Sequence, residues 1–434
     1  MKVLTGLALA LGLCGSLKAA TEVHIKVGGQ GGADARFALG LPPFIAAAPQ
    51  KPEDAVTAKQ LREIVRADLL FSRYFNLLEQ GPHFDGDNRD KIGSDWKNLG
   101  SGWLLTAQVS QAGEKLQMIA RLDNLNAGEA VFERHYKQDK SYQRSLAHKL
   151  SDDVVQAVSG RMGIAQSQIV FANNQSGHKE LYLVDYDGEN LRQLTRHRSI
   201  TLLPRFSPDR RYIAYTSYKD GNPDLFLLDL ANAGLKVLSN KQGLNIAGGF
   251  SADGSQILMT MSRQKSPNLF VKTLSDGQIT QLTQHFGADS SPTFSPDASQ
   301  VAFVSDRSGN PQIYILDMAT HRAKRLTNLN WCDSPSWSPT GEWIAFAGRA
   351  NALDKMDIFL VDVTGNQIRQ LTKGEGSNEN PSWSPDGRFL AFTSTRNSAS
   401  GRDKPELYVM DADGSAPHRI VDIPGSSFTP NWSQ

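Results

Sequence analysis

The sequence has little of three things: cysteine, excess charge of one sign, and long apolar runs. Its 434 residues hold 2 cysteines, and 46 Lys and Arg stand against 45 Asp and Glu, which leaves a net charge of +1. So small a charge gives no drive toward a polyanion, and it argues against nucleic-acid binding through a basic face. No run reaches the roughly 20 apolar residues that a membrane-spanning helix needs. A charged fraction of 21% argues against wholesale disorder.

Residues 1–20 have the features of a secretory signal peptide. Lys2 supplies a positive charge, Val3–Leu13 is an apolar run, and Ala19 and Ala20 are small residues near which cleavage is expected. The alternative is a lipoprotein signal acylated at Cys14, for which the preceding leucine is a poor match. We therefore expect a secreted chain that does not span the membrane.

Removing this segment changes both the charge and the cysteine count. The segment holds two lysines and no acidic residue, so the net charge falls from +1 to −1. Cys332 is then alone, and a single thiol makes no internal disulfide. We interpret it, beside Trp331, as a small buried hydrophobe. The mature protein must be held together by its core.

An aromatic residue followed by Ser returns at intervals of about 45 residues, a period typical of propeller blades or solenoids. The aromatic residues are Phe206, Phe250, Phe294, Trp337, Trp383 and Trp432. Most are followed by Ser-Pro-Asp or a close variant, a turn sequence in which Pro fixes φ and Asp accepts a backbone hydrogen bond. Three short strands follow each turn except the last, which gives four strands per unit and predicts a blade.

The first and last units indicate how the ring closes. Ile169–Ala172, Leu181–Asp185 and Arg192–Thr195 are three strands of a blade that lacks its aromatic first strand. Pro430–Ser433 is a first strand with nothing after it. We therefore predict a closed six-bladed β-propeller over residues 164–434, in which the C-terminal strand completes the first blade.

Residues 21–163 lack this period and predict a small α/β domain. Two segments have the apolar spacing of helices, Thr57–Phe71 and Tyr142–Val158. Three alternate as strands, namely Trp103–Val109, Leu116–Leu122 and Ala130–Tyr136. The fold class is therefore mainly β, a propeller preceded by an α/β domain, with a boundary between residues 163 and 164.

Sequence motifs of catalysis are missing. There is no G-x-S-x-G elbow and no H-E-x-x-H pair. The run Gly28–Gly32 lacks the rest of a phosphate-binding pattern, and we interpret it as a flexible segment. We expect no catalytic residue, no cofactor and no metal. One alternative stays open, a propeller enzyme of the lactonase or lyase kind whose channel metal takes single ligands from several blades.

Distinctive motifs lie where the two predicted domains meet. They are Leu146–Asp152 (LAHKLSD), Gly160–Gly163 (GRMG), Gln168–Phe171 (QIVF), Glu180–Tyr182 (ELY) and Asp185–Gly188 (DYDG). With the signal peptide and a stop just after the sixth aromatic strand, they resemble the TolB family of the Tol-Pal envelope system. The resemblance extends over the mature chain, including Leu41–Phe44 and Asp68–Phe75. Arg73 stands where a glycine is usual, which puts a local turn in doubt.

The resemblance implies a non-enzymatic binding scaffold in the periplasm. The lipoprotein Pal would dock at the mouth of the propeller channel, and the inner-membrane protein TolA would bind the mature N-terminus. Together these partners would support outer-membrane integrity and envelope constriction in cell division.

The positions that match the family's Pal site lie three and four residues before the aromatic residue of each innermost strand. They are Leu202, Leu203, Ile246, Ala247, Ser290, Ser291, Asp333, Ser334, Glu379, Asn380, Phe428 and Thr429. These residues should gather around one opening, because every innermost strand enters the ring from the same side. Their mixture of apolar and hydrogen-bonding groups suits a protein partner better than a small anionic substrate.

For TolA, the resemblance points to the N-terminal segment. It comprises Thr21, Glu22, Val23, His24, Ile25, Lys26 and Val27. The alternation of its apolar residues also fits an edge strand of the first domain. In the functional interpretation, the segment exchanges between docked and free states, with the following glycines as a hinge. Both interpretations stay open.

Overall fold

The computed structural model describes residues 36–48, 51–262, 266–398 and 403–433. The expected signal peptide, the candidate TolA segment Thr21–Val27 and the glycine run after it lie outside the described residues, so the predictions for them stay predictions. No helix in the described ranges has the length and apolar character needed to cross a membrane.

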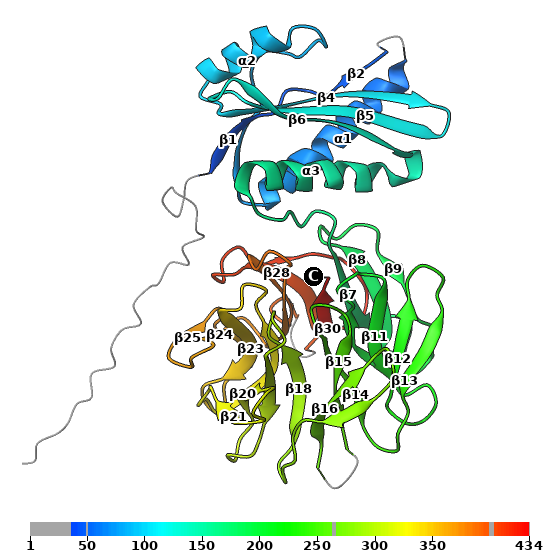
Figure 1. The fold of residues 1–434 in the computed structure, drawn as a ribbon, viewed down its shortest axis with the longest axis vertical. Coiled ribbons are helices and arrows are strands. Elements are labelled where there is room, and N and C mark those ends of the chain that lie inside the picture. The colour runs from blue at the N-terminus through cyan, green and yellow to red at the C-terminus, as the bar shows by residue number, and fades with distance from the viewer. Residues whose placement is uncertain (1–35, 49–50, 263–265, 399–402, 434) are drawn as a thin grey trace, which may run out of the picture. The chain divides into compact units, whose positions relative to one another are not determined.

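An α/β domain comes first (Figure 1). Its elements are β1 (Phe37–Gly40), β2 (Ile45–Ala46), α1 (Pro52–Phe71), β3 (Phe75–Leu78), α2 (Arg89–Asn98), β4 (Trp103–Ala112), β5 (Lys115–Asn124), β6 (Glu129–Asp139), a 3-10 turn (Lys140–Tyr142) and α3 (Gln143–Ser159). The sheet has the order β3-β1-β4-β5-β6, with β2 also beside β4. Strand β1 is parallel to β3 and β4, whereas β4, β5 and β6 form an antiparallel meander.

Helices α1 and α3 bury their apolar sides in the core of this domain. Leu61 and Val65 of α1 lie in one cluster with Leu146 and Leu150 of α3. Their spacing places each pair on a single side of its helix. Helix α3 ends because Gly160 takes a left-handed φ of 69°. The two predicted helices and three predicted strands are confirmed, and the boundary after residue 163 stays a prediction.

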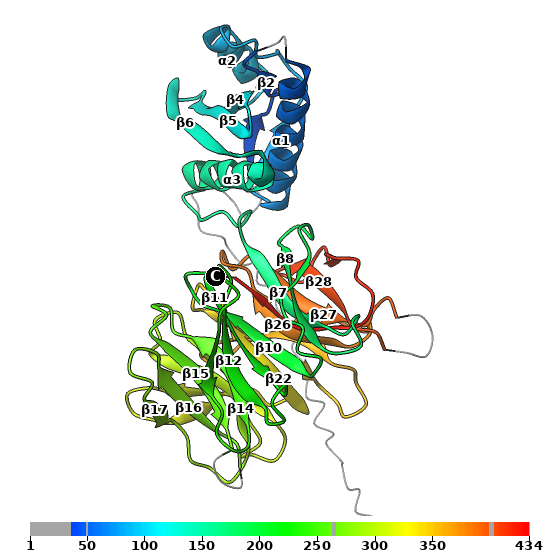
Figure 2. The same ribbon diagram turned by 90° about the vertical axis from the view of Figure 1, so that its right-hand side faces the viewer.

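Six four-stranded sheets follow, and they confirm the predicted six-bladed propeller (Figures 1 and 2). The first blade contains β30 (Ser427–Trp432), β7 (Gln168–Asn173), β8 (Glu180–Asp185) and β9 (Arg192–Gln193). The second contains β10 (Thr201–Phe206), β11 (Tyr212–Ser217), β12 (Asp224–Asp229) and β13 (Leu235–Ser239), and the third β14 (Asn245–Phe250), β15 (Gln256–Met261), β16 (Asn268–Thr273) and β17 (Ile279–Gln281).

The other three blades follow the same order from the innermost strand outward. The fourth contains β18 (Asp289–Phe294), β19 (Gln300–Ser305), β20 (Gln312–Asp317) and β21 (Ala323–Arg325). The fifth contains β22 (Trp331–Trp337), β23 (Trp343–Arg349), β24 (Asp357–Asp362) and β25 (Ile368–Gln370), and the sixth β26 (Asn378–Trp383), β27 (Phe389–Ser394), β28 (Glu406–Asp411) and β29 (His418–Arg419).

The repeated aromatic residues pack between neighbouring blades. Phe206 of the second blade, for example, lies in one cluster with Val170 and Leu183 of the first. The middle strands of each blade are buried on both faces because each sheet packs between two others. Cys332 is fully buried, and burial raises the pKa of its thiol to about 11, as expected for a small core residue.

The Ser-Pro-Asp turns and the Ser-Ala-Asp variant of the third blade use their Asp as predicted. In the third blade, Ser251 Oγ donates to Asp253 Oδ1 (2.6 Å), and the same oxygen accepts from the Ser255 N–H (3.0 Å). Gly254 then takes a φ of 70°. In the second blade Arg210 occupies the place of this glycine with a φ of 59°. The carboxylate is thus used to build the turn.

The C-terminal strand closes the ring as predicted. Trp432 of β30 pairs with Ile169 of β7, and its Nε1 donates to Ser167 Oγ (2.8 Å). The Ser433 N–H donates to the Gln168 carbonyl (2.8 Å), and the Gln168 N–H donates to Ser433 Oγ (3.0 Å). The two ends of the propeller sequence are therefore held together within one sheet.

Candidate functional site

The twelve residues predicted for the channel mouth occupy equivalent places in the six innermost strands. In β10, β18, β22, β26 and β30 a β-bulge begins directly after the first residue of each pair, so the second residue lies within the bulge. In β14 the bulge begins after Ala247, the second residue of its pair. The ring order of the blades brings all six pairs to the same end of these strands. We call these twelve residues the mouth ring.

The backbone of the mouth ring is strained. Five of its residues, none of them glycine, have a left-handed φ between 46° and 55°: Leu203, Ser291, Ser334, Asn380 and Thr429. This conformation costs an L-residue about 1–2 kcal/mol. Strain of this kind persists where the surrounding structure enforces it, and it clusters at binding sites. It is a reason to assign a function to this ring.

Side chains of the innermost strands join neighbouring blades. In the mouth ring, the Leu203 N–H donates to Thr429 Oγ1 (3.2 Å). Two residues deeper, the Phe206 N–H donates to Asn431 Oδ1 (2.8 Å), and the Trp432 N–H donates to Ser382 Oγ (2.9 Å). These bonds fix the strands relative to one another, so the mouth ring is a preorganised surface.

The mouth ring is divided chemically. Blades one to three contribute its apolar side chains, from Leu202, Leu203, Ile246, Ala247 and Phe428, whereas blades four to six contribute its serines, asparagine and acids. Burial raises the pKa of Asp333, and the neighbouring charge of Glu379 raises it further. The Ser334 N–H donates to Asp333 Oδ1 (2.6 Å). The ring can therefore make apolar contacts on one side and polar contacts on the other.

Large exposed apolar side chains surround the same end of the innermost strands. Phe286, 83% exposed, precedes β18, and Ile200 precedes β10. Leu353, 98% exposed, lies between β23 and β24, in a loop that the antiparallel pairing of β22 with β23 places at this end. Apolar side chains gathered in this way are typical of surfaces that bind proteins.

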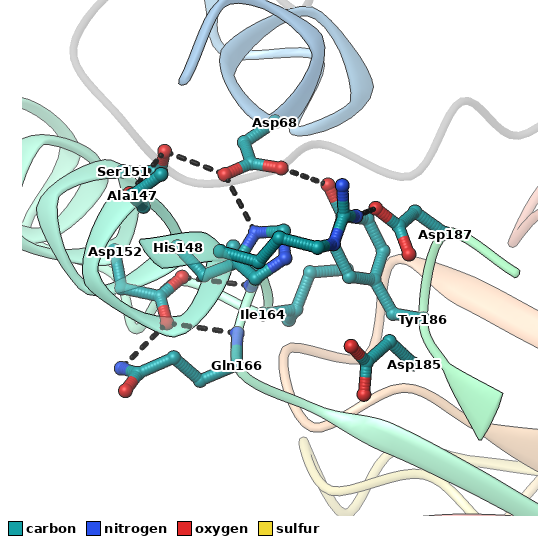
Figure 3. Close-up of polar contacts among 12 residues, drawn as sticks. Asp68, Ala147, His148, Ser151, Asp152, Ile164, Gln166, Asp185, Tyr186 and Asp187 are labelled. Carbon is teal, nitrogen blue, oxygen red and sulfur yellow. Dashed lines mark hydrogen bonds and ion pairs between the residues drawn. The ribbon is translucent and has the colours of Figure 1, made fainter. Parts of the chain in front are cut away.

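A second polar site lies at the other end of the innermost strands, where the α/β domain contacts the first and sixth blades (Figure 3). Its centre is Asp68 of α1, which is 4% exposed. Tyr186 Oη donates to Asp68 Oδ1 (2.5 Å), while Oδ2 lies 2.9 Å from His148 Nδ1 and accepts from Ser151 Oγ (2.7 Å). Arg144 pairs with Asp187 beside them. A buried carboxylate thus joins α1, α3 and the propeller.

Apolar and cationic contacts extend this junction. The ring of Phe71 lies 4.9 Å from that of Tyr186, edge to face, and stacks on Phe389 at 4.7 Å. Arg388 donates from Nη1 to the Ser72 carbonyl (2.5 Å). Arg73 takes the left-handed φ of 62° that favours glycine, and its Nε lies 3.4 Å from Asp411 Oδ2. The turn at Arg73, where the family usually has a glycine, therefore adopts the backbone conformation of a glycine turn. The arginine side chain contacts Asp411 of the sixth blade.

The junction also contains a group of residues that could hold a metal ion. Ligand atoms of Asp68, His148 and Asp187 lie within 4.8 Å of one another. Both acids, however, already have donors, Asp68 from three side chains and Asp187 from Arg144. Both carboxylates are satisfied without an ion, whereas His148 Nε2 has no hydrogen-bond partner among the described residues. The geometry of the two acids is that of a domain contact. In the sequence, the motifs of this region could be interpreted only through their resemblance to a family. The hydrogen bonds of Asp68, His148 and Tyr186 now give these motif residues a structural role.

Comparisons with known proteins agree with both domains. The TolB beta propeller domain family matches residues 155–434, and the TolB amino-terminal domain family matches residues 24–131. The Tol-Pal system protein TolB of Geobacter sulfurreducens is 34% identical over 162 residues, which are 37% of this chain and 38% of the relative. That of Syntrophotalea carbinolica is 38% identical over 162 residues, 36% of this chain and 38% of the relative. These matches therefore span less than half of each relative.

A solved structure covers much more of the chain. The crystal structure of TolB from Acinetobacter baumannii superimposes with a TM-score of 0.77 at 25% identity, over 92% of this chain and 97% of that one. The likeness includes both the α/β domain and the propeller, since neither alone would reach this coverage. The family matches, the fold and the motifs at the junction agree, and the chain belongs to the TolB family.

Proposed function

We propose that this chain is a non-enzymatic protein-binding scaffold of the Tol-Pal system that works in the periplasm. It docks Pal on the mouth ring and TolA through its mature N-terminus, and so supports outer-membrane integrity and envelope constriction in cell division. The observation that carries the docking of Pal is the mouth ring itself, strained, preorganised and surrounded by exposed apolar side chains. A rigid apolar and polar ring favours a protein partner because little conformational freedom is lost on binding.

The chemistry of the channel also favours a scaffold over an enzyme. A channel metal would need ligands from several blades, yet the six innermost strands carry no histidine. Within the described residues, the group that could offer three ligands lies at the domain junction. The mouth ring offers two acids on adjacent blades, Asp333 and Glu379.

Titration calorimetry with the soluble part of Pal tests the docking site. Replacing Ile246 by Glu places a charge on the apolar half of the mouth ring and should weaken binding at least about tenfold. The matched control is Val237→Glu, on the exposed outer strand of the second blade, which should bind Pal unchanged. Equal affinities of the two variants would refute the proposed site.

Removing residues 21–32 tests the role of the N-terminus. We expect this deletion to abolish binding of TolA, and a change in the affinity for Pal would indicate that the segment also exchanges between docked and free states. If the affinities for TolA and Pal are both unchanged, the N-terminal proposal is wrong. Restoration of detergent resistance and normal constriction in cells that lack their own TolB tests the cellular role.

A further inference from the structure

An arginine lies on an innermost strand at a place where the other blades have small uncharged residues. Arg205 of β10 is two residues deeper than the mouth ring and directly precedes the repeated aromatic residue. Its counterparts on the other five strands are Gly249, Thr293, Ser336, Ser382 and Asn431. Strand β10 is covered on one edge by β11 and on its faces by the neighbouring blades. The exposed part of the Arg205 side chain therefore borders the channel.

Arg205 does not have the structural role that two of its counterparts, Asn431 and Ser382, have. Asn431 Oδ1 and Ser382 Oγ each accept a backbone N–H from the next blade. A guanidinium has five donors and no acceptor, so it cannot accept such a bond. The neighbouring strand β14 carries Gly248 and Gly249, which have no side chains to fill the space beside it. This arginine is therefore not needed to join its blade to the next.

The guanidinium of Arg205 has no counter-charge. Among the described residues its side chain makes one hydrogen bond, from Nη1 to the Pro204 carbonyl (3.0 Å), and no carboxylate lies within ion-pair distance. Burial alone lowers its pKa to about 10, so it stays charged at neutral pH. The residue is partly buried, and removing part of a charge from water without a partner costs free energy that a bound anion would recover.

The acids of the mouth ring are too distant to pair with this arginine. In a six-membered ring the fifth blade faces the second, so Asp333 stands across the channel from Arg205 and at the outer level. The charge that affects the pKa of Asp333 is that of Glu379, and no charge affects that of Arg205. The channel mouth therefore holds opposite charges on opposite sides, and neither neutralises the other.

We propose that Arg205 is a subsite for a carboxylate carried by the protein segment that docks on the mouth ring, an inference that rests on the proposed function. The carboxylate inserts past the ring and binds the guanidinium fork, while apolar residues of the same segment cover Leu202 and Leu203 on the same strand. A basic residue of the segment meets Asp333 and Glu379 opposite, which fixes its orientation. A free anion would lack the apolar contacts and would be repelled by those acids.

Calorimetric titration with the soluble part of Pal tests this subsite. Arg205→Gln should weaken binding about tenfold or more, since the partner's carboxylate loses a charged hydrogen-bond donor. Arg205→Lys should lose less, because it keeps the charge but not the fork. The matched control Arg322→Gln, on an exposed loop, should bind as the parent does. Equal affinities of the parent and Arg205→Gln would overturn the proposal.

The stability of the free protein separates this role from a structural one. Since Arg205 is a partly buried cation without a counter-charge, Arg205→Gln should melt at the same temperature as the parent or higher, whereas loss of a structural arginine would lower Tm. A lower Tm together with weaker binding would therefore refute the subsite.

Acetate serves as a probe that does not depend on Pal. Binding of acetate should shift the Arg205 side-chain NMR resonance of the mature protein, with no such shift when Pal is already bound. If Pal does not bind the parent protein, the proposed function is wrong. If the Arg205 resonance also does not shift at saturating acetate, the proposed subsite is wrong as well. If acetate alone binds as tightly as Pal does, the ligand is a free anion and the assignment to a protein segment is wrong.

Discussion

Removal of residues 430–434 should open the propeller. This change deletes the last part of β30, which completes the first blade and pairs with β7. Trp432 is fully buried there, in one cluster with Ile169 and Phe171 of β7. The edge of β7 would then be unpaired at Ile169 and Val170, whose partners Trp432 and Asn431 are removed.

The magnitude follows from the contacts that are lost. Deleting a buried tryptophan side chain costs about 3–5 kcal/mol. Five hydrogen bonds that Asn431, Trp432 and Ser433 make to Phe206, Ser382, Ser167 and Gln168 are lost as well, each with a net contribution of about 0.5–1.5 kcal/mol. The total, on the order of 8 kcal/mol, is comparable to the whole stability of a typical domain, about 5–15 kcal/mol.

Calorimetry and near-ultraviolet circular dichroism would measure the effect. We expect Tm to fall by about 15 °C or more, at the roughly 2 °C per kcal/mol usual for a protein of this size. Phe286→Ala, which removes an aromatic side chain that is 83% exposed, should leave Tm unchanged. If the truncated chain melts with the parent, β30 does not hold the ring together and the closure argument is wrong.

Two predictions concern the junction. Tyr186→Phe removes a donor to the buried carboxylate of Asp68 and should lower the free energy of unfolding by about 1.5–3 kcal/mol in urea titrations, whereas Tyr182→Phe, whose buried hydroxyl has no partner among the described residues, should cost nothing. Burial opposes the charge on His148, but the hydrogen bond and charge of Asp68, aided by Asp187, raise its pKa overall. This stabilisation is complete below about pH 6.5 and is lost as pH rises through the raised pKa, so the advantage of the parent over His148→Gln should shrink above that pH. If the difference in unfolding free energy between the parent and His148→Gln does not vary with pH, Asp68 does not stabilise a charged His148.

The propeller could be predicted from the sequence because its signals repeat. Phe206, Trp337 and Trp383 mark the same place in different blades, and each is followed by strands whose apolar runs reflect burial on two faces. The offset between the first and last units required that the C-terminal strand belong to the first blade. Local turn chemistry and a fixed period sufficed, and no long-range contact had to be known.

The first domain was predicted less completely. Strand β1 and strand β3 hold four residues each, and α2 is a polar helix of ten residues with few apolar positions to show a period. These elements are defined by their neighbours, since β1 lies between β3 and β4 in the sheet. Helix α1 begins at Pro52, five residues before its apolar spacing does, because proline suits the first turn of a helix.

The site could be predicted in position but not in its chemistry. The sequence repeat predicted where the mouth ring lies. It could not predict the left-handed backbone of Leu203 or Asn380, because that conformation arises from the β-bulges. Arg205 was missed because a lone arginine in a strand has no sequence signature; its meaning depends on the absence of a carboxylate nearby. The hydrogen bonds of Asp68 join residues at least 80 positions apart, and no local sequence pattern indicates them.

The two polar sites are linked by β30, and this link decides which variants can separate function from stability. Phe428 and Thr429 lie in the mouth ring, whereas Trp432, at the other end of the same strand, bonds Ser167 in the segment that leads from α3 to β7. That segment is held by the carboxylate of Asp152, which accepts the Ala165 N–H (2.8 Å). A change at the mouth end of β30 therefore also disturbs ring closure and the domain connection. The side chain of Arg205, on β10, takes part in neither ring closure nor the domain connection. A loss of partner binding in an Arg205 variant can therefore be attributed to the channel mouth itself.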